Sequence, residues 1–156
     1  MKMDHNFFEC VCIKSEHELS QAWEAIERMF AVIVFDPDGQ IIEVNKVFMD
    51  ATGYNREELI GQHHRMLCDK KYTESKDYVE FWNILRSGKR HYGTFRRVRK
   101  DGSDLFLYAE YTPILDDNGH VVKVLKIAQN TSRVAEHLIK KLGMSEQLIG
   151  RLLTMQ

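Results

Sequence analysis

Two adjacent histidines, His63 and His64, are the side chains of this sequence best suited to chemistry. They lie in a polar stretch, residues 62–73, that has neither the period of a helix nor the alternation of a strand. Neutral imidazole is a common metal ligand, and one of the two would suit the axial position of a haem iron. Alternatively, both merely cap or hydrogen-bond this irregular stretch. Residue type and spacing leave both interpretations open.

Cysteine usage gives little further chemistry. The three cysteines are an odd number without a CxxC pair: Cys10, Cys12 and Cys68. A disulfide framework and a zinc knuckle are therefore both poorly supported, and a reducing, cytoplasmic location is expected. The thiols are expected to be small buried or idle groups.

Signatures of catalysis are missing from the sequence. There is no Gly-rich phosphate loop, nucleophile elbow or HExxH motif. His137 resembles a phosphoacceptor of a histidine kinase only in its helical setting, and no residues remain for an ATP-binding domain. We therefore predict that the chain is not an enzyme.

Length and charge limit the classes of partner. A chain of 156 residues has room for one compact domain with short flanking helices. Its 22 Lys and Arg nearly balance 23 Asp and Glu, so no nucleic-acid partner is expected. The basic run within residues 96–100 is interpreted as a solvated strand end. The longest apolar stretches are far shorter than the ~20 residues of a membrane span, and residues 1–20 lack the apolar block of a secretory signal.

The elements that would position the histidines follow from periodicity. Apolar residues at helical spacing predict a helix over residues 16–30, and a change of period predicts strands at 31–35 and 40–44 around a turn. Short helices should follow Asn45 and Asn55, the latter with a capping box to Glu58, and Ser75 should cap another. That last helix carries one apolar stripe: Tyr78, Phe81, Trp82 and Leu85.

The second half of the chain predicts three strands and a helix. The strands are expected at residues 91–99, 104–115 and 121–129, separated by Asp-Gly and Asn-Gly turns. A helix over 133–142 should end near Gly143, with a further helical segment toward Leu153. Segregated elements of this kind predict an α+β domain in which a five-stranded antiparallel sheet carries helices on one face.

The order of elements and an ordered set of motifs resemble the PAS family over residues 22–132. The motifs are Asp38-Gly39, Asn45, Gly53-Tyr54, Glu58-Leu59-Ile60-Gly61, Phe81-Trp82, Gly93, Phe95-Arg96-Arg97, Lys100-Asp101-Gly102, Tyr111-Thr112-Pro113-Ile114, and Asp117 with Gly119. The resemblance implies a sensor domain with an N-terminal cap helix and a C-terminal exit helix. The run Gly61 to Asp69, with Ser75 and Tyr78, looks more specifically like PAS domains of bacterial methyl-accepting chemotaxis proteins and aerotaxis receptors.

The resemblance also implies a ligand site between sheet and helices. Along residues 104–115, the odd positions, including Leu107 and Tyr111, should face that site, while the even ones should lie under the lead-in helix beside Trp23. In the register of the related flavin-binding light sensors, His64 replaces the photoreactive cysteine, which excludes a cysteine–flavin adduct. Arg65 matches a residue that holds a flavin phosphate.

The implied cofactor-binding residues are His64, Arg65, His63, Trp82, Leu107, Tyr111 and Asn45, and His64 would be the metal ligand only if the cofactor is haem. Haem b, flavin and no cofactor all remain open, because the fourth strand lacks the tryptophan of haem-binding members and the polar groups of flavin-binding ones. Trp82 and Phe81 are alternatively core residues.

The resulting hypothesis is a cytoplasmic input domain of a chemotaxis-type transducer, divided into an N-terminal segment (1–18), a sensor domain (19–132) and a signalling helix (133–156). Homodimerisation through the terminal helices is expected, with a downstream signalling domain or the chemotaxis machinery as partner. The alternative is a ligand-free dimerisation or docking module. Asn130-Thr131-Ser132 stands where the family usually has Asp-Ile-Thr or Asp-Val-Thr, which puts the usual coupling to the exit helix in doubt.

Overall fold

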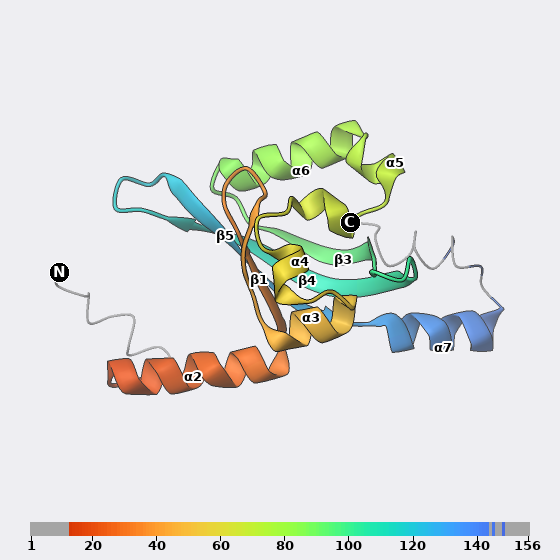
Figure 1. Ribbon diagram of the computed structural model, residues 1–156, viewed down its shortest axis with the longest axis horizontal. Helices are drawn as coiled ribbons and strands as arrows, with labels where there is room; N and C mark the ends of the chain where they lie inside the picture. Colours follow the sequence, from red (N-terminus) through yellow and green to blue (C-terminus); the bar gives the residue numbers. More distant parts are fainter. Residues whose placement is uncertain (1–12, 144, 146–147, 149–156) are drawn as a thin grey trace.

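The protein folds around one five-stranded sheet in which every neighbouring pair is antiparallel (Figure 1). This computed structural model describes residues 13–143, 145 and 148. The strands are β1 (Ala31–Phe35), β2 (Ile41–Val44), β3 (His91–Val98), β4 (Asp104–Leu115) and β5 (Val121–Asn130). Their spatial order is β2-β1-β5-β4-β3, so the first and last strands of the chain are neighbours at the centre. The predicted antiparallel sheet is confirmed.

Short helices connect β2 to β3 and cover one face of the sheet (Figure 1). They are α3 (Lys46–Thr52), α4 (Arg56–Leu59), η1 (His64–Leu67), α5 (Lys70–Thr73) and α6 (Lys76–Arg86). The stretch 62–73, which showed no period, thus contains one 3₁₀ turn and one α turn, each too short to display a repeat.

The predicted helix signals have the expected geometry. Asn55 and Glu58 form both halves of a capping box at α4. Ser75 accepts a hydrogen bond from the Tyr78 amide at the start of α6, and Gly53 ends α3 in the left-handed conformation. Local sequence therefore fixes where these short helices begin and end.

The flanking helices lie outside the sheet–helix layer. Helix α2 (Glu16–Met29) has no buried residue, and Trp23 is 37% exposed, so the expectation that α2 covers the outer face of β4 was wrong. Helix α7 (Ser132–Leu142) covers part of that face instead, because Phe106 packs against Ala135, with Leu138 and Ile139 beside them. Figure 1 shows α2 and α7 extending along opposite halves of the molecule. The predicted segment toward Leu153 lies largely outside the described residues.

The inner face of the sheet contains a row of small residues. Strand pairing aligns Gly93, Ala109, Ala128 and Ala31 across β3, β4, β5 and β1. The next row on the same face aligns Tyr111 with Lys126 and Ile33. The small row leaves space above the sheet that longer side chains from neighbouring rows can fill.

No helix among the described residues is both long and apolar enough to cross a bilayer.

Candidate functional site: the buried interior around His64

His64 is held in the interior by the edge of β2. Its backbone amide donates to the Gly39 carbonyl at 2.8 Å, and Gln40 forms an isolated bridge with His63. His63 stays half-buried, and its Nδ1 accepts from the Arg65 amide at 3.1 Å. His63 therefore caps η1, whereas His64 is fully buried at 0% exposure.

The His64 ring joins the helical layer to the sheet. Its Nδ1 lies 3.1 Å from the Tyr78 hydroxyl on α6, and its Nε2 lies 3.2 Å from the Tyr111 hydroxyl on β4. Arg97 Nη2 donates to the same Tyr111 oxygen at 3.1 Å. The Tyr111 hydrogen is therefore free to be donated to Nε2, and we assign the His64 proton to Nδ1, which donates to Tyr78.

Electrostatics keep this histidine neutral. Burial lowers the pKa of His64 well below its ordinary value, and the positive charges of Arg97 and Lys126 lower it further. Burial likewise raises the pKa of Tyr78 to about 12, so that hydroxyl stays protonated. At neutral pH the His64–Tyr78–Tyr111 group is an uncharged hydrogen-bonded bridge.

Aromatic rings surround His64 at contact distance. Phe35 and Trp82 meet its ring edge-on, with centroids 5.4 Å and 5.5 Å away, and Phe81 stacks on it at 5.5 Å. Trp82 and Leu107 are 4% and 1% exposed. The interpretation of Trp82 and Phe81 as core residues agrees with this packing.

Two cations accompany these rings, and sequence reasoning missed both. Arg97 is 3% exposed, which contradicts the interpretation of the basic run as wholly solvated, and Lys126 is 0% exposed. Strand alternation was the available signal, because Arg97 has the parity of Phe95, and Lys126 that of Val124 and Ala128. In the described part of the chain, no ion pair with a carboxylate includes either cation.

The interior in this packing does not fit haem or flavin. An axial ligand needs a free ring nitrogen, but both nitrogens of His64 face tyrosine hydroxyls. A flavin ring would need the volume that Phe35, Trp82 and Tyr111 occupy in mutual contact. Arg65 is exposed and could reach a phosphate only at the surface.

Asn45, the remaining predicted ligand residue, has a structural task. Its Oδ1 accepts from the amides of Val32 and Phe48, each at 2.9 Å. Its Nδ2 donates to the carbonyls of Glu27 and Phe30 at 2.9 Å and 2.8 Å. All four hydrogen-bonding positions of this amide are used within the chain, so Asn45 ties the end of α2 to β1 and α3.

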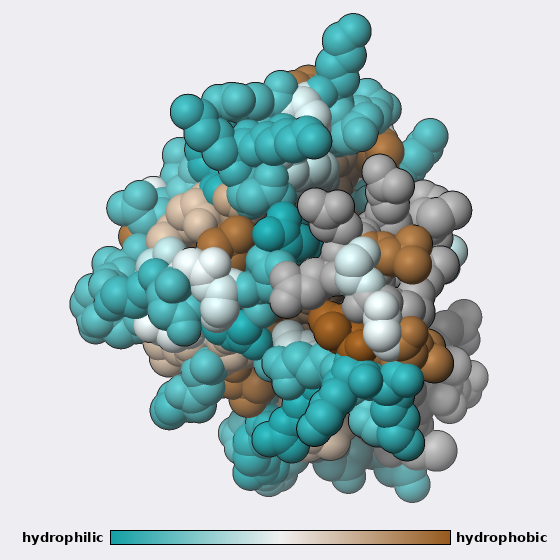
Figure 2. Space-filling model, turned by 90° about the vertical axis from the view of Figure 1, so that its right-hand side faces the viewer, coloured by the Kyte–Doolittle hydropathy of each residue, from teal (hydrophilic) through white to brown (hydrophobic). Residues whose placement is uncertain are grey.

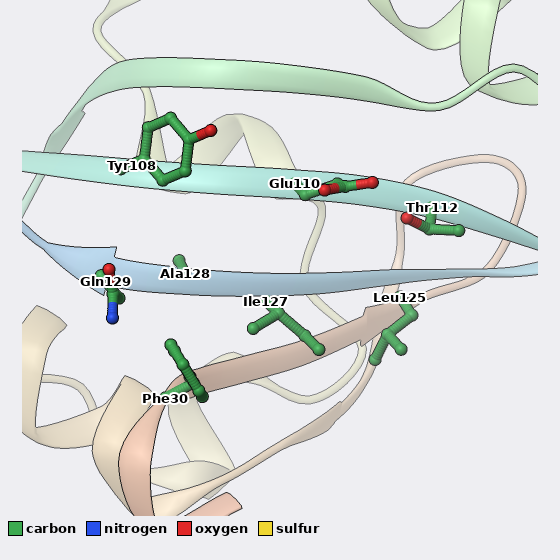
Figure 3. A pocket seen from close by; sticks show the side chains of 8 residues that line it. All are labelled: Phe30, Tyr108, Glu110, Thr112, Leu125, Ile127, Ala128 and Gln129. Atoms are coloured by element: carbon green, nitrogen blue, oxygen red, sulfur yellow. The ribbon is translucent and has the colours of Figure 1, made fainter. Parts of the chain in front are cut away.

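A separate groove of about 370 Å³ lies on the outer face of the sheet (Figure 3). Residues of β4 and β5, together with the residue that follows α2, line it: Phe30, Tyr108, Glu110, Thr112, Leu125, Ile127, Ala128 and Gln129. Tyr108 remains 49% exposed. This groove is mainly apolar and lies on the side of the sheet opposite His64.

Comparison with protein families decides the class of the domain. Residues 29–133 match the family model described as a PAS domain, which is most of the sheet–helix layer. The chain belongs to the PAS domain family. Its antiparallel sheet, the helices on the inner face and the flanking helices are those expected of a PAS sensory domain.

Relatives of this PAS domain occur in longer proteins. It is 40% identical over 110 residues to biofilm dispersion protein BdlA of Pseudomonas aeruginosa, covering 70% of this chain and 26% of that protein. It is 30% identical over 125 residues to Phototropin-2 of Oryza sativa subsp. japonica, covering 80% of this chain and 14% of that protein. The chain thus spans only a minor part of either relative.

A solved PAS domain from Colwellia psychrerythraea has a similar structure. The TM-score is 0.64 at 27% identity, and the match covers 74% of this chain and 98% of that one. The similarity therefore extends over nearly the whole of that domain.

Proposed function

We propose that this PAS domain is the sensory input of a chemotaxis-type signal transducer, in which events at the His64 interior are relayed to the flanking helices. The observation that carries the proposal is the buried His64 bridge between α6 and β4. A small ligand that alters this bridge would shift the helical layer relative to the sheet, provided that it binds the two arrangements with different affinity.

The route to α7 starts on β4. Phe106 lies five residues before Tyr111 on the same strand, and its amide donates to Ser132 Oγ at 3.0 Å. Its carbonyl accepts from the Thr131 amide at 2.8 Å. A shift of β4 would therefore move the first turn of α7 through two direct hydrogen bonds.

The departure at Asn130-Thr131-Ser132 is compatible with this route. Asn130 Oδ1 accepts from the Ser132 amide at 3.0 Å, so a neutral amide oxygen supplies the acceptor at the start of α7. Arg99 Nη2 also reaches Ser132 Oγ at 3.3 Å. We infer that the junction holds α7 without the acidic residue usual in the family.

Amide hydrogen exchange tests the relay. Tyr111→Phe removes the hydroxyl that meets both His64 and Arg97, and it should speed exchange in residues 132–142 by roughly three-fold or more. Tyr92→Phe is the matched control, because Tyr92 lies on neighbouring β3 with its side chain 47% exposed. If faster exchange in Tyr111→Phe stays confined to β4 and its immediate neighbours, the relay is refuted.

The alternative is a ligand-free docking module, and the outer groove is the observation that favours it. An apolar groove with an exposed Tyr108 is a feature of interaction surfaces. Under this alternative, Tyr108→Lys would abolish partner binding or self-association, while Tyr111→Phe would leave α7 exchange unchanged. The two functions thus make opposite predictions for one experiment.

An absorbance spectrum of protein purified from its native host tests the cofactor question. The packing around His64 predicts neither a Soret band nor the paired blue bands of a flavin. A Soret band lost in His64→Ala would show that the interior opens to haem and that His64 is its ligand.

The finer assignments extend the same proposal. We propose a cytoplasmic location, no catalytic activity, homodimerisation through the terminal helices, and a downstream signalling domain or the chemotaxis machinery as partner. The division into 1–18, 19–132 and 133–156 remains our prediction for the boundaries.

A further inference from the structure

Three buried side-chain donors have no hydrogen-bond partner in the described part of the chain: Trp82 Nε1, Arg97 Nε and Lys126 Nζ. Two of them belong to cationic side chains, because Lys126 Nζ and Arg97 Nε are fully buried and donate to no protein acceptor within bonding distance. An unpaired buried donor costs about 1–3 kcal/mol, and an unpaired buried charge costs more. A negatively charged hydrogen-bond acceptor in the interior would therefore stabilise these unpaired donors.

Contacts with aromatic rings offset only part of the cost of burying these two cations. Lys126 Nζ lies 4.8 Å from the Tyr111 ring centroid and 5.8 Å from that of Phe48. The Arg97 guanidinium lies 4.9 Å from the Phe95 centroid. Cation–π contacts of this kind contribute about 2 kcal/mol when desolvated, which is less than the cost of burying an ammonium ion.

Tyr111 brings the two cations to one place. Arg97 Nη2 donates to its hydroxyl, while Lys126 stands over its ring from the neighbouring strand. Burial lowers the pKa of Lys126 well below its ordinary value, and the positive charge of Arg97 lowers it further, so the two cations lie close together. Beside Tyr111 and Lys126 runs the row of small residues at Gly93, Ala109 and Ala128.

We propose that this PAS domain binds a short-chain monocarboxylate in the interior, with its two oxygens accepting from Lys126 Nζ and Arg97 Nε and its alkyl group over the alanine row. Two separate N–H donors match the two oxygens of a carboxylate. The rings and alanine methyl groups suit a short apolar tail, and tight packing restricts the ligand to a few atoms. The inference deepens the proposed function by naming a ligand class for the same interior.

Thermal unfolding with acetate and propionate tests the proposal. Each should raise Tm in a saturable manner, by about 4 °C at ten times Kd. Acetamide and propionamide, which have the same shape without the charge, should have no effect. Chloride at equal ionic strength controls for salt. No saturable rise with either carboxylate, or an equal rise with chloride or the amides, would refute the site.

Matched variants locate the effect. Lys126→Met should abolish the carboxylate response, whereas Lys123→Met, which removes an exposed cation from the same strand, should retain it. Lys126→Met should also fold well, because methionine is a similarly long, unbranched side chain that does not bury an unpaired charge. An unchanged response in Lys126→Met would contradict the assignment.

Methyl NMR of the wild-type protein gives a measurement that needs no variant. Acetate should shift the methyl signals of Ala31, Ala109 and Ala128, which lie in the small row. Shifts confined to methyl groups elsewhere would refute the site. If a carboxylate binds but hydrogen exchange in α7 does not change, the relay is refuted and the binding site is retained. If Tyr111→Phe changes hydrogen exchange in α7 but no carboxylate binds, the binding site is refuted and the relay is retained.

Discussion

At the scale of single residues, His64 shows how burial decides the role of a side chain. The same imidazole that could bind iron is enclosed by rings and bonded at both nitrogens. It is therefore a neutral bridge in this packing, and its protonation is opposed by both burial and neighbouring cations. Acid should consequently act on the interior through this residue.

The first prediction concerns stability at low pH. The pKa of His64 in the folded protein lies below its unfolded value near 6.5. Below about pH 6.5, His64 is therefore protonated in the unfolded chain while it stays neutral in the folded protein. The free energy of unfolding should therefore fall with decreasing pH, by up to about 1.4 kcal/mol per pH unit from this group. Urea unfolding between pH 7.5 and 5 measures it.

His64→Gln is the variant for that measurement, because an amide keeps a donor and an acceptor but does not titrate. Its stability should fall less steeply with acid than that of the wild type. The free energy of unfolding of this variant should still depend somewhat on pH, because burial also lowers the pKa values of His63 and His91. Identical slopes for both proteins would contradict the assignment of His64.

The second prediction concerns the turn that holds η1 in place. Gly39 has φ +88°, and a Cβ there would lie 2.8 Å from Trp82 Cζ2 and 2.9 Å from His63 Nε2. Gly39→Ala should destabilise the protein by about 2–3 kcal/mol from backbone strain and steric conflict together. Gly119 also has a positive φ (+82°), but a Cβ there would meet no atom within 4 Å. Gly119→Ala should therefore lose less stability, and the difference between the two losses measures the steric contribution at Gly39. Equal losses would argue against the close approach.

At the scale of elements, the junction of β4 with α7 replaces the expected contact between β4 and α2. Phe106 packs under α7, and the backbone of Phe106 bonds to Thr131 and Ser132. Helix α2 is tied instead at its end by Asn45. The two flanking helices thus reach the sheet through different strands.

The third prediction tests this junction. Ser132→Ala leaves the buried Phe106 amide without its acceptor and should cost about 1–3 kcal/mol. The loss should appear as faster hydrogen exchange across residues 132–142. Ser87→Ala removes an exposed hydroxyl that bonds to Ile84 and should change stability by less than about 0.5 kcal/mol. If Ser132→Ala loses no more stability than Ser87→Ala, the hydrogen bond from the Phe106 amide to Ser132 does not hold α7 in place.

At the scale of the whole molecule, apolar side chains remain exposed around the layer that contains the core. Val134 and Leu142 on α7 are 58% and 63% exposed, and Met29 on α2 is 65% exposed. Figure 2, which looks onto the side where α7 lies, shows apolar patches among polar surface. The proposed homodimer would cover such residues.

The fourth prediction measures assembly. Light scattering coupled to size exclusion should report a dimer of the wild-type protein, and Val134→Lys should convert it to a monomer. His137→Lys, also at an exposed position of α7, should leave the dimer intact. A wild-type monomer at high concentration would contradict dimerisation, and a dimeric Val134→Lys would exclude α7 as its interface.

The sequence by itself determined the elements, because their signals are local. The capping box of Asn55, the Ser75 cap and the Asp-Gly and Asn-Gly turns each act within a few residues, and the ordered motifs indicated the PAS family. Strand alternation put Leu107 and Tyr111 on the same face of their strand, and the resemblance to the flavin-binding light sensors implied that this is the inner face. Only tertiary structure decided that α7 rather than α2 covers Phe106, and that Arg97 and Lys126 meet around Tyr111. Those contacts depend on the register between strands far apart in sequence, which no local pattern encodes.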